Sequence, residues 1–308
     1  MPGMSITRRT VLAGLAAAAA PAIIGAQSRS SERLPISFST LGCPKWPWKR
    51  VLEQASAMGF AAIEVRGIEM KMDLTTLPEF SGTGLAASIK DLDALGLKIS
   101  DLGASARMHE GDPKVRQAQM DEGRRFIDLA QKLKTPYIRV FGDKVPPGEQ
   151  KRDVMARVVD GLRTLGGHAK GSGVMVLLET HGDYTDSPTV VELMKAASMD
   201  TVGLVWDAHH TFVAGKEQPS TSYAALKPWV RHTHLKDSTP EGAKPNEVRY
   251  VLTGKGTVPV REQVRLLKAG GYKGYYGFEW EKGWHPEIEE PEVAFPQFVE
   301  TIRAYLSS

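Results

Sequence analysis

The sequence predicts an α/β protein whose strands close into a (β/α)8 barrel, the TIM barrel. Short apolar runs rich in β-forming residues recur along the chain, stretches with helical spacing lie between them, and no linker divides the 308 residues. Strands that alternate with helices indicate a parallel sheet, and eight such repeats indicate closure of that sheet. The expected strands are residues 36–41, 60–65, 97–102, 137–141, 174–178, 202–206, 230–235 and 274–278.

Local signals mark where the helices begin and end. Asp112-Pro113 and Ser187-Pro188 each place a capping side chain before a proline that fits the first helical turn. A doubly wound sheet would need a glycine-rich phosphate turn after its first strand, and residues 41–45 (LGCPK) supply none. Left-handed helix ends are expected at Gly59, Gly96, Gly173 and Gly271.

The composition is that of a soluble globular protein, with 42% hydrophobic and 24% charged residues. Lys and Arg number 39 against 36 Asp and Glu. This balance gives no general attraction for nucleic acid or for an anionic membrane. Because Cys43 is the single cysteine, no disulfide can form within the chain. We expect no nucleic-acid partner.

The N-terminus has the pattern of an export signal. The pair Arg8 and Arg9 precedes an alanine-rich apolar run that ends in small residues near Ala26, as in twin-arginine signal peptides. The run is shorter than the about 20 apolar residues that cross a bilayer, which disfavours a membrane anchor. We therefore expect residues 1–26 to be a cleaved signal peptide and residues 27–308 to form a single TIM-barrel domain. The mature protein is expected in the periplasm, with no stable membrane span.

Metal-binding side chains close four consecutive expected strands. In a barrel of this kind, residues at the carboxyl ends of strands face the catalytic mouth. Each carboxylate alone could cap a helix or pair with an arginine, but several converging carboxylates would repel one another unless a cation compensated them. Carboxylates and an imidazole suit Mn²⁺, Mg²⁺, Co²⁺ or Zn²⁺. We expect one divalent metal ion, with Mn²⁺ preferred, at Glu179, Asp207, His234 and Glu279.

Other side chains near the strand ends are candidate substrate contacts. Glu64 lies at the end of the second expected strand and Arg66 follows on the same face, which suits recognition of substrate hydroxyl or carbonyl groups, although an ordinary ion pair explains them almost as well. Trp46 could stack on a sugar ring or pack beneath a loop. His181 could orient Glu179 or meet substrate. Lys236 could assist an oxyanion, and His232, on the same strand face, is expected to lie deeper with a hydrogen-bond partner.

Four segments, in order, carry a resemblance to a known family. Residues 177–182 (LLETHG), 206–210 (WDAHH), 231–237 (RHTHLKD) and 271–279 (GYKGYYGFE) resemble motifs of the sugar phosphate isomerase/epimerase family. That family has the xylose isomerase-like barrel and includes ketose 3-epimerases and inosose dehydratases. The resemblance implies that His210 binds substrate. It also implies that the metal ligands are the strand-end residues Glu179, Asp207, His234 and Glu279.

The chemistry expected of such a site is proton abstraction beside a carbonyl. A divalent ion that chelates a ketone oxygen and a neighbouring hydroxyl eases loss of the adjacent proton and stabilises the enediolate. Glu179 and Glu279 could act as base and acid from opposite faces. The sequence therefore predicts a metal-dependent sugar isomerase or epimerase that acts on an unphosphorylated keto-sugar or polyol. The alternative is a metal-dependent lyase or dehydratase acting on a 3-keto-glycoside or keto-inositol.

Two other function classes stay open but are disfavoured. An apurinic endonuclease shares the fold, but that family uses a trinuclear zinc cluster with more histidines, and the end of the third expected strand offers no ligand. A sugar-binding protein without catalytic activity would have the same cavity at the barrel mouth but would not convert its ligand. Whether the protein is a sugar enzyme or a sugar-binding protein, the expected partner is a small carbohydrate. The sequence leaves the oligomeric state open, a homo-oligomer included.

Overall fold

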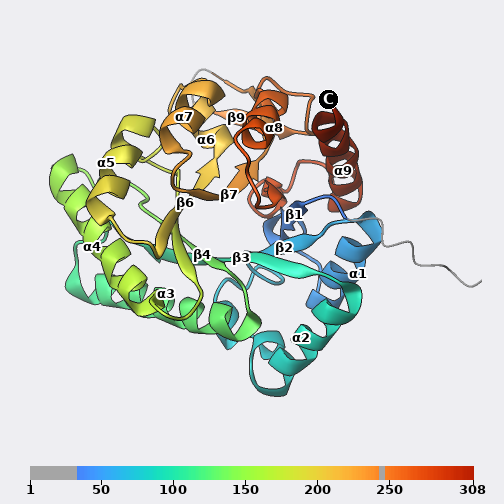
Figure 1. The fold of residues 1–308 in the computed structure, drawn as a ribbon, viewed down its shortest axis with the longest axis horizontal. Coiled ribbons are helices and arrows are strands. Elements are labelled where there is room, and N and C mark those ends of the chain that lie inside the picture. Colours follow the sequence, from blue (N-terminus) through green and yellow to red (C-terminus); the bar gives the residue numbers. More distant parts are fainter. Residues whose placement is uncertain (1–32, 243–246) are drawn as a thin grey trace, which may run out of the picture. The chain divides into compact units, whose positions relative to one another are not determined.

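Eight parallel strands form a closed barrel in the order β1-β10-β7-β6-β5-β4-β3-β2, and helices surround it (Figure 1). The computed structural model describes residues 33–242 and 247–308. The predicted fold class is confirmed, whereas the expected signal peptide lies outside the described residues. The barrel strands are β1 (Ile36–Ser39), β2 (Ala62–Val65), β3 (Lys98–Arg107), β4 (Tyr137–Phe141), β5 (Met175–Glu179), β6 (Val202–Asp207), β7 (Val230–Leu235) and β10 (Tyr276–Phe278).

The helices follow the expected start signals with one change. Asp112 caps its helix by accepting hydrogen bonds from the backbone of Lys114 and Val115, but the cap at the second site is Asp186, which precedes the expected Ser187. The α-helices are α1 (Trp48–Met58), α2 (Gly82–Leu95), α3 (Pro113–Leu133), α4 (Lys151–Ala169), α5 (Ser187–Ala197), α6 (Ala208–Val213), α7 (Pro219–Leu226), α8 (Val260–Ala269) and α9 (Pro291–Ser307). The 3₁₀ turns are η1 (Thr40–Gly42), η2 (Leu74–Thr76), η3 (Pro78–Phe80) and η4 (Glu281–Gly283).

Aromatic side chains seal the barrel where its first and last strands meet. Phe38 of β1 and Phe278 of β10 are paired in register. Phe38 packs against Phe295 of α9 with ring centroids 4.4 Å apart, and Phe278 stacks on Phe298 at 4.2 Å. In Figure 1 this last helix, in red, completes the outer ring beside α1. Packing of α9 thus stabilises the closure.

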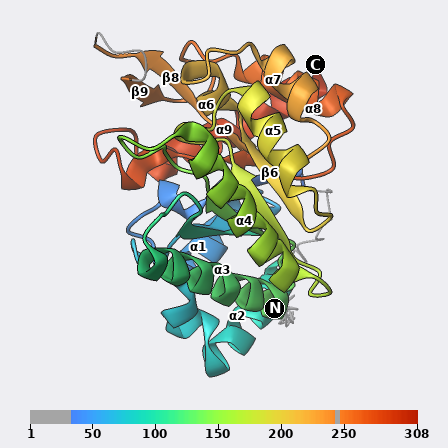
Figure 2. The same ribbon diagram turned by 90° about the vertical axis from the view of Figure 1, so that its left-hand side faces the viewer.

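Two features depart from the expected strands. β3 runs five residues beyond the expected end at Leu102, because the small residues that follow still fit a strand, and this carries Arg107 to the mouth. An antiparallel hairpin of β8 (Asp237–Pro240) and β9 (Val248–Val251) is inserted after β7. Figure 2 shows it on the same side of the molecule as the loop before α9, and Tyr250 indeed contacts His285 of that loop.

Candidate metal centre and active site

The four strand-end residues expected to bind metal converge in the barrel. Glu179 ends β5, Asp207 ends β6, His234 lies in β7 and Glu279 follows β10. All four are buried, and one ligand atom from each lies within 4.8 Å of the others. The Nδ1 atom of His234 lies 3.2 Å from Glu279, 3.6 Å from Glu179 and 3.8 Å from Asp207, measured to a carboxylate oxygen in each case.

The ring of His234 is oriented from behind by Glu64. Its Nε2 atom lies 2.6 Å from Oε2 of Glu64, and both side chains are buried. Its Nδ1 atom, which faces the three carboxylates, has no hydrogen-bond partner. A histidine whose far nitrogen is held by a carboxylate is the arrangement typical of metal-ligating histidines. The donor set therefore fits a divalent cation.

Two buried cations lie beside the carboxylates. The ammonium of Lys236 is 2.7 Å from Asp207 and 2.8 Å from Glu281, and it also contacts Glu279. The guanidinium of Arg139 is 3.2 Å from Glu179. Burial alone would raise the pKa of Glu179, but Arg139 and His234 hold it below its usual value. Burial is likewise outweighed at Asp207, whose pKa His210 and Lys236 lower. Both carboxylates are therefore ionised at neutral pH.

Three expected substrate contacts, Glu64, Trp46 and Lys236, do not line the mouth cavity. The carboxylate of Glu64 contacts Nε2 of His234 and lies 3.3 Å from Nε2 of His232, so it interacts with the two histidines rather than with the cavity. His232 is 3.2 Å from Asp101 as well, which matches the deep, hydrogen-bonded position expected for it. Trp46 is buried because its loop folds against α9, where the indole packs on Phe295. Lys236 is directed at the carboxylates rather than at the cavity.

A cavity of about 260 Å³ opens above the four residues. The expected residues Arg66, His181 and His210 line it, and the rings of the two histidines are 5.0 Å apart. Sequence reasoning missed Arg139, although a charged residue inside an apolar strand was a usable signal, and it missed Tyr250 of the inserted hairpin. The full lining is Leu41, Arg66, Arg107, Arg139, Phe141, Asp143, Glu179, His181, His210, Tyr250, Glu279, Glu281 and Trp284.

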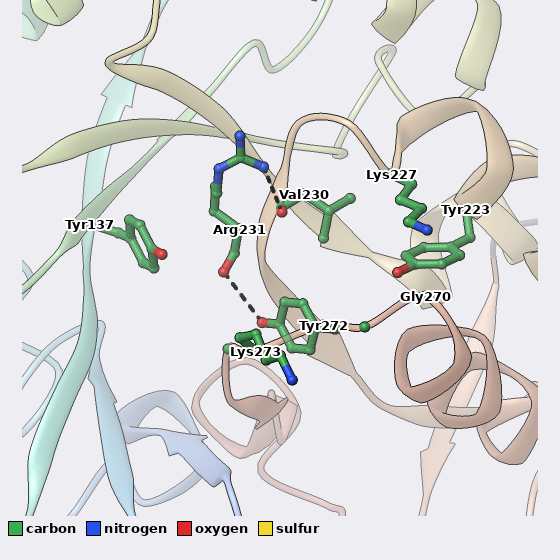
Figure 3. A pocket seen from close by; sticks show the side chains of 10 residues that line it. Tyr137, Tyr223, Lys227, Val230, Arg231, Gly270, Tyr272 and Lys273 are labelled. Carbon is green, nitrogen blue, oxygen red and sulfur yellow. Dashed lines mark hydrogen bonds between the residues drawn. The ribbon is translucent and has the colours of Figure 1, made fainter.

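A second hollow, of about 300 Å³, lies at the opposite end of the barrel, where β4 and β7 begin (Figure 3). Its labelled side chains include Tyr137, Arg231, Tyr272 and Lys227. No carboxylate or histidine is among its described lining residues, so it offers a divalent cation no suitable ligand. The candidate site is therefore the cavity at the carboxyl ends of the strands, as expected for this fold.

The comparison with known proteins agrees with the barrel fold. A family model described as a xylose isomerase-like TIM barrel matches residues 52–303. The chain belongs to this family. Within it, the chain is similar to the fructoselysine 3-epimerase of Shigella flexneri, with 24% identity over 282 residues that cover 87% of this chain and 96% of that protein.

Solved structures of other proteins share the fold. The probable 3-DHS dehydratase AsbF of Bacillus anthracis superposes with a TM-score of 0.73 at 17% identity, covering 88% of this chain and 99% of the other. The IOLI protein with a bound zinc atom superposes with a TM-score of 0.71 at 18% identity, covering 89% and 96%. In the described part of this chain, no helix is both long enough and apolar enough to span a bilayer.

Proposed function

We propose that the protein is a divalent-metal-dependent sugar isomerase or epimerase that abstracts a proton next to the carbonyl of a keto-sugar or of a polyol that carries a keto group. The observation that carries this proposal is the convergence of Glu179, Asp207, His234 and Glu279 beneath an open cavity. Similarity to a named 3-epimerase supports the reaction class.

The same four residues would hold the ion, with Mn²⁺ preferred and Mg²⁺, Co²⁺ or Zn²⁺ as alternatives. The unpartnered Nδ1 of His234 among three carboxylates supports this assignment. The zinc bound by the IOLI protein supports a metal in the family. When bound, the ion would polarise the substrate carbonyl and stabilise the negative charge of an enediolate.

The two glutamates are suited to moving the proton. Burial would raise the pKa of Glu279, but His234 and Lys236 lower it, so Glu279, like Glu179, is ionised and can accept a proton from carbon. β5 and β10 are separated in the barrel by β6 and β7, so the two carboxylates approach substrate from different sides. One removes the proton and the other returns it. Asp207 is less free, because its Oδ1 accepts a hydrogen bond from the backbone of His210.

A lyase or dehydratase is the second candidate, and Glu281 favours it. This carboxyl lines the cavity, and burial together with Glu279 raises its pKa. A carboxyl whose pKa is raised beside the substrate is suited to donate a proton to a leaving hydroxyl or alkoxide. Similarity of fold to a probable dehydratase is consistent with this alternative.

Proton exchange tests the proposal. The metal-loaded protein is incubated in D₂O with neutral and acidic keto-sugars, and deuterium is followed by NMR at the carbon beside the carbonyl. We expect wash-in with an intact carbon skeleton, whereas release of water or an aglycone identifies the lyase. Glu179→Gln and Glu279→Gln should each abolish exchange, and Arg231→Gln, at the far end of the barrel, should retain it. If the unmutated protein binds a sugar but exchanges no deuterium into it and releases no product, the proposal of an enzyme is refuted and a binding protein is indicated.

Export to the periplasm is a separate proposal that rests on the pattern of residues 1–26. Cell fractionation of the native host, with and without a functional twin-arginine pathway, tests it. Accumulation in the cytoplasm in both strains would contradict export.

A further inference from the structure

One wall of the mouth cavity is built from arginines. Arg66 follows β2, Arg107 ends β3 and Arg139 lies in β4, which are neighbouring strands. In the closed strand order, β2 stands diametrically across from β6, the strand of Asp207. The cavity therefore has a cationic wall that faces the carboxylate-rich side.

Arg66 differs from its two neighbours in its partners. Arg139 is paired with Glu179 at 3.2 Å, and Arg107 is paired with Asp143 at 3.5 Å. Within residues 33–242 and 247–308, Arg66 forms no ion pair. Its guanidinium donates only to neutral acceptors, which are the Ser105 hydroxyl at 3.1 Å, the Gly103 carbonyl at 3.4 Å and the Met72 sulfur at 3.3 Å.

The surrounding residues fix the position of this unpaired guanidinium. Arg66 is only 8% exposed, and the nearby carboxylate of Glu122 is engaged by the backbone N–H of Ser105 at 2.6 Å. A Cβ atom at Gly103 would lie 2.7 Å from Cδ of Arg66 and 2.9 Å from Nη2 of Arg139, so glycine is needed for both side chains to lie over β3. Burial and the charge of Arg139 lower the pKa of Arg66 to about 10, although the more distant carboxylates of Glu179, Glu64 and Glu279 act in the opposite direction.

A buried guanidinium with no carboxylate at ion-pair distance is costly, and an anionic ligand that enters the cavity and contacts it directly would reduce that cost. A planar guanidinium matches a carboxylate through two parallel hydrogen bonds. Two negative charges on a phosphate dianion would need more than one free cation nearby. The other two arginines of the wall are already in ion pairs with carboxylates.

We propose that Arg66 binds a carboxylate of the substrate, so that the substrate is a sugar acid rather than a neutral sugar. The inference rests on the proposed function for the reaction itself and adds the substrate class. Arg66 then determines specificity, because the cost of its unpaired charge penalises a neutral sugar of the same shape.

Binding of a matched pair of glycosides tests the inference without turnover. Methyl β-D-glucuronide and methyl β-D-glucoside share a ring and differ in a carboxylate against a hydroxymethyl group. Calorimetry on the Mn²⁺-loaded protein should show the glucuronide binding about tenfold tighter or more, the size expected of a charge-assisted hydrogen-bonded pair. Arg66→Gln should remove the preference, and Arg66→Lys should keep part of it.

The controls separate this contact from other causes. Arg231→Gln removes the same charge from the far end of the barrel and should leave the preference intact. Circular dichroism verifies that each variant is folded. Equal affinities, no glucuronide binding, or a preference that survives Arg66→Gln would overturn the inference. Tighter binding of glucose 6-phosphate than of the glucuronide would overturn the carboxylate assignment in favour of a phosphate.

The two proposals fail in different ways. Deuterium exchange into neutral keto-sugars with no preference for the glucuronide would sink the sugar-acid inference and leave the proposed reaction standing. A glucuronide preference that depends on Arg66, in a protein that exchanges no proton in any keto-sugar, would support the sugar-acid inference and refute the proposed reaction.

Discussion

Replacing Glu64 by glutamine should weaken metal binding although Glu64 is not itself one of the four proposed ligands. Its carboxylate lies 2.6 Å from Nε2 of His234, and both groups are buried, so the negative charge orients the imidazole and makes Nδ1 a stronger donor to a cation. The amide of the substituted glutamine can still accept a hydrogen bond but carries no charge. We expect the Kd for Mn²⁺ to rise about tenfold, which corresponds to about 1.4 kcal/mol.

Isothermal titration of Mn²⁺ into chelator-treated protein measures this effect. Asp101→Asn is the matched control, because Asp101 contacts His232 at 3.2 Å but makes no contact with His234. That variant removes a buried carboxylate of the same layer and should bind Mn²⁺ with nearly the wild-type Kd. A wild-type Kd in Glu64→Gln, or an equal loss in Asp101→Asn, would refute the role given to Glu64.

Further outcomes follow from the same contacts. Burial, together with Glu64, raises the pKa of Asp101 to about 7, above its value in the unfolded chain. Protonated Asp101 therefore stabilises the fold at low pH, and this contribution is lost as the pH rises through about 7. In urea unfolding, the free energy of unfolding of Asp101→Asn should fall less between about pH 5 and about pH 8 than that of the unmutated protein. Phe295→Ala should lower the free energy of unfolding by about 3–5 kcal/mol in the same assay, and a loss comparable to that of an exposed substitution would contradict the role of α9 in closure. Gly103→Ala should cost about 1–3 kcal/mol by displacing Arg66, and should weaken glucuronide binding in calorimetry; unchanged values for both would show that the arginines can move aside. Mn²⁺ at about 100 times its Kd should stabilise the protein by about 2.7 kcal/mol, seen as a rise in Tm that a chelator reverses, and no rise would count against the metal centre.

The convergence of the strand-end residues could be predicted from the sequence, because it depends on topology more than on detail. In a parallel barrel, the residue that ends each apolar run must face the mouth. Glu179 and Asp207 end such runs, and the structure places them together with His234 and Glu279. Their role as metal ligands stays a prediction until an ion is observed.

Depth within the barrel could not be predicted in the same way. Glu64 and Arg66 are two residues apart and share a face, yet Glu64 serves the histidines below while Arg66 lines the cavity. The difference arises from the stagger of neighbouring strands, which a single strand does not encode. The sequence left the position of Trp46 open for a related reason, because its burial depends on α9, about 250 residues later in the chain.

The β8–β9 hairpin has a consequence for how this barrel can change over time. It follows Leu235, the last residue of β7, and places Tyr250 in the lining of the mouth cavity. At its base, Asp237 accepts hydrogen bonds from the backbone of Gly254 and Gly256. Through Tyr250 the hairpin therefore bears on the shape of the entrance, whereas the carboxylates are carried at the ends of β5, β6 and β10. Insertions and deletions in this hairpin would let related proteins diverge in the substrates that enter the cavity, while the residues at the strand ends and their chemistry stay the same.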